Sequence, residues 1–439
     1  MAKIGLISLG CPKNTVDAEE ILGEIEKAGH EIETNPARAE VLIVNTCGFI
    51  RSAKEEAIDS ILDAVRYKTN GACRSVIVTG CLAQRYGQEL AEEIPEADAF
   101  LGLGKVRDIP ETISRTLQGA RVVSIGDPCA WWTDRRSRVL STPPWTAYLR
   151  IADGCDNRCA YCVIPSIRGG FRSRPEEIVL DEARALAEVG VRELNLVAQD
   201  ITRYGLDTEG ELRLPRLLEK LAALEGIRWI RLLYCYPTRI TEELVRTIAE
   251  NEKVCKYVDV PLQHCSDRIL RAMGRQGSKQ AYLDLFARIR ESCPQAALRT
   301  TLIVGFPGET EDEFEELMGF VKRVRFDRVG VFPYSAEEGT PAALLPDKVH
   351  HSTIGRRYRR LMGLQQEISL DKNKKLIGAR IEVLIEGSEG ELAVGRSYRD
   401  APDIDGLVYV KGGSALAGEF VSAEVTGARP YDLIARYGS

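Results

Sequence analysis

The sequence predicts an α/β protein with a doubly wound parallel sheet, a partial (β/α)6 barrel of parallel strands and a small C-terminal β-barrel. Strand-like and helix-like segments alternate over residues 1–125 and again from residue 146, which is typical of parallel sheets. After residue 377 the pattern changes to short β-type runs with glycine-rich turns, which is typical of a small barrel. We therefore expect domains at residues 1–125, 146–376 and 377–439, with a linker at 126–145.

The composition is that of a soluble globular chain. The protein has 439 residues, of which 44% are hydrophobic and 28% are charged. It has no apolar run long enough to span a bilayer and begins with a strand rather than a signal peptide, so we expect a cytoplasmic protein without a membrane partner. Twelve cysteines then favour metal or redox chemistry, because cytosolic thiols are kept reduced. The net charge of −6 argues against a protein dominated by nucleic-acid binding.

Three cysteines of the N-terminal region each follow a predicted strand. The predicted strands are Ile4–Ser8, Val41–Asn45 and Ser75–Thr79, and the predicted helices are Thr15–Ala28, Ala53–Tyr67 and Arg85–Ile94. Cys11, Cys47 and Cys81 come just past the strands, at the edge where open α/β sheets bind ligands. Gly10 and Gly80 permit tight turns there. Because the same position recurs three times, these residues predict a three-cysteine cluster site rather than three unrelated buried thiols.

The segment from Pro128 to Pro144 predicts an irregular linker and a domain boundary. It places Trp131-Trp132 and Arg135-Arg136 between prolines, without helical or strand periodicity.

The central region opens with a second group of three cysteines. The strand-like run Ala147–Ile151 leads into Cys155, Cys159 and Cys162, which the spacing crowds onto one loop. Three thiolates are one ligand short of a closed zinc site or a fully ligated iron–sulfur cubane, so a cluster held here leaves one iron open. The following strands are predicted at Glu193–Val197, Trp229–Leu233, Tyr257–Val260, Leu298–Val304 and Asp327–Phe332, with helices at Glu176–Glu188, Thr241–Asn251, Lys279–Glu291 and Glu311–Val324. Six such units fit a partial barrel better than a complete eightfold one.

Two loops at strand ends of this region are candidates for binding a small molecule. Val304–Thr310 follows a buried strand and precedes a helix, so its backbone amides could meet a carboxylate or hydroxyl. The alternative is a glycine–proline turn with Thr310 as the helix N-cap. The second loop, Ala198–Thr202, offers amide and carboxylate contacts.

The last part of the chain predicts a basic helix and then a β-barrel. Lys348–Leu376 is rich in arginine and lysine, which usually marks a solvated face. The barrel strands are predicted at Glu382–Ile385, Glu391–Arg396, Gly406–Val410 and Phe420–Val425.

The CxxxCxxC loop, with Tyr161 before its last cysteine, resembles the signature of the radical S-adenosylmethionine (SAM) enzymes. The whole arrangement resembles the methylthiotransferase branch of that family, which joins a flavodoxin-like domain, a radical SAM barrel and a TRAM β-barrel. The resemblance implies one 4Fe–4S cluster on Cys11, Cys47 and Cys81 and a second, SAM-binding one on Cys155, Cys159 and Cys162. We expect SAM contacts from Tyr161, Gln199, Gly305 and Glu309, and we assign no catalytic residue beyond the cluster ligands.

Two short motifs resemble the members of this branch that modify a ribosomal protein. These are Ser8–Asn14 and Ala401–Gly406; the relatives that modify tRNA usually have Gln-Met where this chain has Pro12-Lys13. The resemblance implies that a methylthio group is added to the β-carbon of an aspartate in small-subunit ribosomal protein S-twelve, free or within the ribosome. SAM would be both radical source and methyl donor, and a small reductant protein of the flavodoxin or ferredoxin type would supply electrons.

The charge of the last domain gives an independent reason to prefer a protein substrate. Residues 377–439 contain six Lys and Arg against ten Asp and Glu, a net charge of −4, whereas RNA binding needs cations for phosphates. An acidic barrel suits a basic protein surface. The basic run before it points the other way, because it could touch ribosomal RNA. The alternatives are a tRNA methylthiotransferase, a non-enzymatic iron–sulfur electron carrier or redox sensor, and zinc at the N-terminal cysteines.

Overall fold

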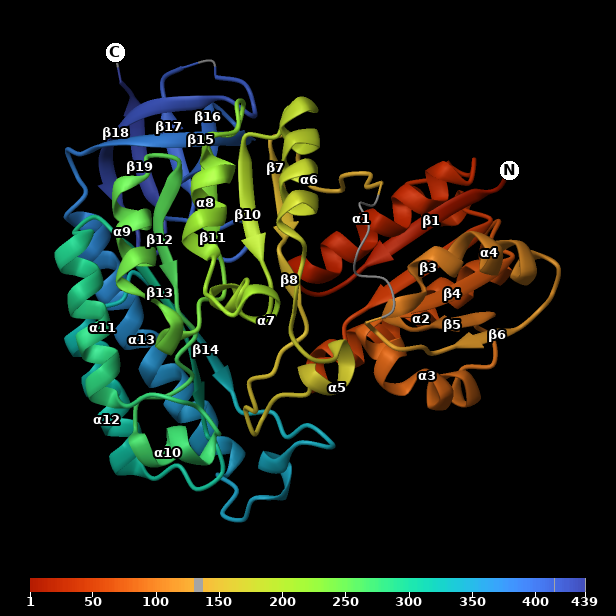
Figure 1. The fold of residues 1–439 in the computed structure, drawn as a ribbon, viewed down its shortest axis with the longest axis horizontal. Helices are drawn as coiled ribbons and strands as arrows, with labels where there is room; N and C mark the ends of the chain where they lie inside the picture. The colour runs from red at the N-terminus through yellow and green to blue at the C-terminus, as the bar shows by residue number, and fades with distance from the viewer. Residues whose placement is uncertain (130–136, 414, 439) are drawn as a thin grey trace.

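The computed structural model describes residues 1–129, 137–413 and 415–438. It contains two six-stranded parallel sheets and a closed five-stranded barrel, arranged as Figure 1 shows. These three units confirm the predicted fold class. The predicted linker residues Trp131-Trp132 and Arg135-Arg136 lie outside the described residues.

The N-terminal sheet is doubly wound. Its strand order is β2-β1-β3-β4-β5-β6, and all neighbours are parallel. Alternate residues of β3 face opposite sides: Leu42 packs under α2 and α3, and Ile43 packs under α1 and α4. The elements are β1 (Lys3–Ser8), α1 (Pro12–Lys27), β2 (Glu31–Ile32), β3 (Val41–Thr46), α2 (Arg51–Asn70), β4 (Ser75–Gly80), α3 (Cys81–Glu93), β5 (Ala99–Leu101), α4 (Ile109–Leu117) and β6 (Val122–Ser124).

The central sheet is the predicted partial barrel. Its order β14-β13-β12-β11-β10-β7 leaves β14 and β7 as edges, so the barrel is open. The strands are β7 (Thr146–Arg150), β10 (Glu193–Val197), β11 (Trp229–Leu232), β12 (Val254–Asp259), β13 (Ala297–Val304) and β14 (Arg328–Pro333), and β8 (Ala152–Asp153) pairs with β9 (Arg172–Ser173) beside them. The helices are α5 (Ile164–Arg168), α6 (Glu176–Glu188), α7 (Leu206–Glu209), α8 (Leu214–Ala222), α9 (Glu242–Glu250), α10 (Asp267–Ala272), α11 (Lys279–Ser292), α12 (Glu311–Val324) and α13 (His351–Lys374).

The C-terminal barrel docks on the amino ends of the central strands. Its strands are β15 (Arg380–Glu389), β16 (Leu392–Ser397), β17 (Val408–Lys411), β18 (Phe420–Ala428) and β19 (Leu433–Tyr437), of which sequence reasoning missed β19. At the start of β10, Glu193 accepts hydrogen bonds from Arg231 and from Arg396 of β16, and all three side chains are buried. The loop after β16 reaches the central barrel. There its Asp405 accepts a hydrogen bond from the hydroxyl of Tyr257 of β12 at 2.6 Å. Figure 1 shows this unit at the end of the molecule away from α5.

Candidate active site between the two parallel sheets

The first three predicted cysteines gather at one edge of the N-terminal sheet. Cys11 is the N-cap of α1, Cys47 follows β3, and Cys81 begins α3 directly after β4. Gly10 and Gly80 have φ of +99° and +96°, as tight turns require. A side chain at Gly10 would have its Cβ 2.9 Å from that of Cys47, so only glycine lets the first two loops approach this closely.

Asn14 ties the three cysteine loops together. Its side-chain amide donates to the backbone oxygens of Leu9, before Cys11, and of Thr46, before Cys47, at 3.0 and 2.8 Å. Its Oδ1 accepts a weak hydrogen bond from the Cys81 thiol at 3.4 Å. Sequence reasoning used Asn14 only as part of a motif, because the three partners are distant in the chain.

Two cations lie beside this triad. Burial raises the pKa of Cys81 to about 12, and the Arg168 guanidinium, whose Nη2 is 3.5 Å from its Sγ, opposes that rise. Burial also acts on Cys11, but Lys13, Arg168 and two backbone N–H groups outweigh it and lower the pKa of this thiol. Arg168 and Lys13 therefore favour the thiolate form that a metal cluster requires.

The second triad sits on the loop after β8. Cys155 is buried and accepts a hydrogen bond from the Asn157 N–H at 3.4 Å, and the Cys162 N–H donates to the Cys159 backbone oxygen at 3.0 Å. Burial raises the pKa of Cys155 to about 11 and that of Cys162 to about 12. This triad too has a buried arginine: Arg275 lies 3.6 Å from the Cys159 Sγ and donates to the Tyr161 hydroxyl at 3.3 Å.

Helix α5 connects the two triads. It begins two residues after Cys162, and its apolar face packs Val163 and Ile167 against Cys81 and Leu103 of the N-terminal unit. At its end Arg168 donates to Asn14 and to Asp17 of α1 at 2.8 and 2.6 Å. The structure therefore brings both triads to the junction of the two sheets, which spacing alone does not predict.

The donor sets consist of thiols, the ligands that hold iron–sulfur clusters. Within the described ranges, no three His, Cys, Asp or Glu side chains converge closely enough to hold one metal ion. In an iron–sulfur cluster each thiolate binds a different iron, so the ligands surround a group several atoms across. The residue types of both triads fit such a group, and each triad has a buried arginine beside it.

Of the predicted SAM contacts, Gln199 and Tyr161 lie at the carboxyl ends of the strands. Gln199 follows β10, and both polar atoms of its amide are buried without a hydrogen-bond partner, which points to a ligand there. Tyr161 packs in an apolar group with Phe306, the residue after Gly305.

Gly305 and Glu309 are joined by a hydrogen bond. The Gly305 N–H donates to the Glu309 carboxylate, which also lies 3.4 Å from Arg357 of α13. Thr310 caps α12 in a capping box with Glu313, the alternative that the sequence left open. The Glu309 N–H donates to the Phe306 oxygen and the Gly308 N–H to the Asp347 oxygen, so these backbone amides already have partners within the protein. The loop approaches Tyr161 through Phe306.

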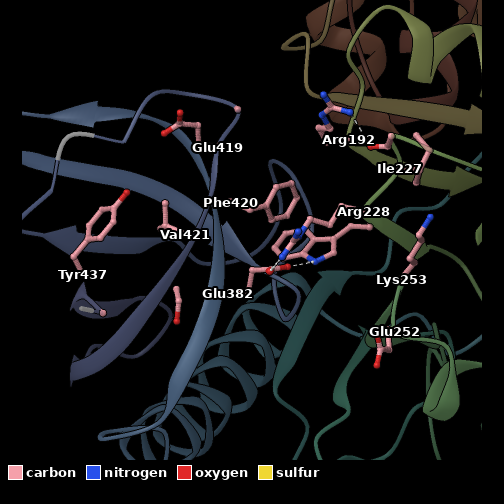
Figure 2. Close-up of a pocket in the computed structure, with 15 residues that line it drawn as sticks. Arg192, Ile227, Arg228, Glu252, Lys253, Glu382, Glu419, Phe420, Val421 and Tyr437 are labelled. Atoms are coloured by element: carbon pink, nitrogen blue, oxygen red, sulfur yellow. Dashed lines mark hydrogen bonds and ion pairs between the residues drawn. The ribbon is translucent and has the colours of Figure 1, made fainter.

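A cavity of about 1070 Å³ lies at the other end of the barrel, and none of the predicted site residues line it. Figure 2 shows Arg228 and Glu382 paired there, with Phe420 and Tyr437 contributed by the C-terminal barrel. It is a seam between two units, distant in the fold from the cysteine loops.

The remaining cysteines form no further cluster in the part of the chain that the structure describes. Cys73, Cys235, Cys255, Cys265 and Cys293 are buried. Cys129 is only half-buried, and its Sγ lies 2.7 Å from Arg172.

Comparisons with known proteins agree with this architecture. A model of the radical SAM superfamily matches residues 149–321, the uncharacterized protein family UPF0004 matches residues 3–102, and the TRAM domain matches residues 377–437. The solved structure of the radical SAM methyltransferase TsrM from Kitasatospora setae, with cobalamin and a 4Fe–4S cluster bound, has a TM-score of 0.56 at 14% identity. It covers 90% of this chain and 77% of that one, and the likeness shows the fold alone.

Fold and site together define a radical SAM enzyme, a class that uses a 4Fe–4S cluster and SAM. The chain is 52% identical to a protein of Desulforamulus reducens named ribosomal protein uS12 methylthiotransferase RimO, over 99% of both chains. A protein of Geobacter sulfurreducens with the same name is 51% identical over 98% of both chains. The chain belongs to the RimO family of methylthiotransferases. Among the described residues, no helix has the length and apolarity needed to cross a membrane.

Proposed function

We propose that this protein adds a methylthio group to the β-carbon of an aspartate in ribosomal protein uS12. The observation that carries this proposal is the full-length similarity, about half the residues identical, to proteins named for that activity. A ribosomal-protein substrate implies a cytoplasmic reaction, and the ribosome or its small subunit is the setting where that substrate occurs.

Cys155, Cys159 and Cys162 would hold the SAM-binding cluster, and Cys11, Cys47 and Cys81 a second 4Fe–4S cluster. When bound, SAM and the clusters would supply the SAM-derived radical, the sulfur and, from SAM, the methyl group. The chain's own residues hold them: Arg168 and Arg275 offset the negative charge of the thiolates, and Tyr161 and Gln199 line the SAM side. Val163 and Ile167 pack against Cys81 and Leu103 and so cover the Cys81 thiol on this side.

The charge of the C-terminal barrel supports a basic protein substrate. Three of its acids, Glu382, Asp400 and Asp405, pair with arginines of the central barrel, and Arg396 and Arg399 pair with acids there. Seven acids and four bases are left, so the domain stays acidic by three charges after docking. The basic helix α13 uses many of its cations internally; Arg357 and Arg360 pair with Glu311 of α12.

The test is to incubate the anaerobically reconstituted, reduced enzyme and SAM with uS12 or with tRNA. We expect a methylthio mass gain on uS12 and release of 5′-deoxyadenosine. A mass gain on tRNA alone would support the tRNA-modifying alternative, and an absence of SAM cleavage would support an electron carrier or redox sensor.

Iron analysis tests the ligand sets separately from activity. We expect about eight irons per wild-type chain and about four in Cys47→Ala. Cys73→Ala, which removes a buried thiol of the same sheet, is the matched control and should keep about eight. Zinc in place of half the iron would contradict the 4Fe–4S cluster on Cys11, Cys47 and Cys81.

A further inference from the structure

Lys13 has an unusual environment for a lysine. It is the second residue of α1, and its side chain is only 8% exposed, which makes it the one buried lysine among the described residues. It makes none of the ion pairs or hydrogen bonds that the structure shows for this part of the chain. Burying an ammonium group is costly unless an anion or acceptor meets it, so this position calls for a negatively charged partner.

The side chain of Lys13 reaches from the N-terminal sheet to the mouth of the barrel. Its Nζ lies 3.7 Å from the centroid of the Tyr234 ring, and Tyr234 follows β11 at the carboxyl end of the central sheet. Tyr234 has φ of +66°, a strained conformation for a tyrosine that is typical of functional sites. A cation–π contact orients an ammonium but leaves its charge uncompensated.

Carboxylates of the chain itself are already used by other cations. Asp153 is the nearest acid in electrostatic terms, and it is paired with Arg168 at 3.1 Å and with Arg150 at 3.8 Å. Asp17, one turn along α1, pairs with Arg150 and Arg168 as well. The Cys11 thiolate, whose charge Lys13 favours, would be a ligand of the cluster. No carboxylate among the described residues pairs with Lys13, so its ammonium can meet the carboxylate of a bound molecule.

The location of Lys13 selects among possible anions. Its Nζ contacts the ring of Tyr234 after β11, and it lies two residues after Cys11, whereas the SAM-side cysteines lie on the loop after β8. This places Lys13 beside the Cys11 triad and not on the loop that would hold SAM. Lys13 faces the side where the substrate carbon must meet the Cys11 triad.

We propose that Lys13 binds the side-chain carboxylate of the substrate aspartate and so selects an acidic residue for modification. The inference rests on the proposed function. In aspartate the carboxylate is bonded directly to the β-carbon, so fixing the carboxylate on Lys13 fixes the reacting carbon between the two triads. Asparagine has the same shape but no charge, and glutamate has its carboxylate one methylene further away.

The test compares two substrate peptides with three variants of the holoenzyme. The peptides carry the uS12 target sequence with either aspartate or asparagine, and binding is measured with SAM present and no reductant. The variants are Lys13→Met, which keeps the length and removes the charge, Lys13→Arg, which keeps the charge, and Lys27→Met. Lys27 is the exposed last residue of the same helix and serves as the control.

We expect the wild-type and Lys27→Met enzymes to bind the aspartate peptide about 10- to 100-fold more tightly than the asparagine peptide. Lys13→Met should bind the two peptides equally, and Lys13→Arg should recover most of the preference. Iron content, measured on each sample, reports whether Lys13 serves the neighbouring cluster instead.

The proposal is overturned if Lys13→Met keeps the preference for aspartate, or if it loses iron while both peptides weaken by the same factor. If either result is found and the wild-type enzyme still methylthiolates the peptide, only the role of Lys13 is overturned and the proposed function stands. A wild-type enzyme that leaves the peptide unmodified and modifies tRNA overturns both.

Discussion

The guanidinium of Arg168 donates to Asp17 of α1, to Asp153 of the central unit and to Asn14 between the cysteine loops. All four side chains are buried. Removing one partner from such a network leaves uncompensated charges in a low-dielectric interior, which costs far more than removing an exposed ion pair.

We therefore expect Arg168→Met to lower the free energy of unfolding by about 3–5 kcal/mol. Arg184→Met, which breaks an exposed pair with Asp181 on α6, should cost less than about 1 kcal/mol. Urea denaturation followed by circular dichroism compares the two. Equal losses would mean that Arg168 is not a structural link between the units.

The buried carboxylate of Glu193 predicts how the free energy of unfolding changes in acid. Burial acts to raise its pKa, but Arg396 and Arg231 outweigh burial and lower the pKa from 4.5 to about 2. Below pH 4.5 the unfolded chain takes up a proton at this residue and the folded chain does not. Its contribution to stability is therefore full above pH 4.5 and is lost as pH falls toward 2.

Glu193→Gln should be less stable than wild type at pH 7, because two arginines lose their carboxylate. It should also show a shallower fall in stability between pH 4.5 and 2. Thermal unfolding across this range measures both effects, and parallel acid profiles for the two proteins would contradict the assignment.

At the scale of helices and strands, the sequence predicted those features that depend on residues close together in the chain. Glu176–Glu188 and Glu311–Val324 are helices with the predicted bounds, and the strand-end rule put Cys11, Cys47 and Cys81 on one edge. Helix α1 begins at Pro12 rather than at the predicted Thr15, because proline is well tolerated in the first helical turn.

The residues that the sequence did not indicate act over long distances. Arg275 reaches Cys159 from more than a hundred residues away, and Arg168 reaches α1 from another unit. The cation–π contact between Lys13 and Tyr234 joins two sheets. Periodicity and spacing describe neighbours in the chain, so such partners become visible only when the units are packed together.

The turn between β15 and β16 of the C-terminal barrel gives a prediction about the surface that binds the substrate. Glu389 and Glu391 flank the exposed turn between β15 and β16 and have no partner among the ion pairs shown for the described residues. Replacing both by lysine should weaken binding of uS12 several-fold at low salt and much less at high salt, because exposed charges are screened. Unchanged affinity at low salt would place the docking surface elsewhere.

At the scale of the whole molecule, the C-terminal barrel completes a hydrophobic cluster of the central barrel. Ala401 and Leu384 pack with Tyr148, Trp229 and Tyr257 in one apolar cluster. Buried ion pairs surround this contact, among them that of Arg328 with Asp400 at 2.6 Å. The division into units at 1–125, 146–376 and 377–439 stays a prediction, since compact units need not fold independently.

Deleting residues 377–439 should therefore cause misfolding rather than only a loss of substrate affinity. We expect little soluble protein and low iron content, measured by sedimentation and iron analysis, whereas the Glu389 and Glu391 substitutions should leave both near wild type. A truncated chain that stays monomeric and keeps both clusters would contradict this expectation.

The C-terminal barrel sits at the amino ends of the central strands, and the cysteine loops lie at their carboxyl ends. Strand β13 alone has eight residues and so extends roughly 26 Å. A peptide with the target sequence needs only the carboxyl ends of the strands, whereas a substrate that also contacts the C-terminal barrel must span this distance. If uS12 docks on the C-terminal barrel, this distance would favour an aspartate at a matching distance from the docked surface over acidic residues elsewhere on the same protein.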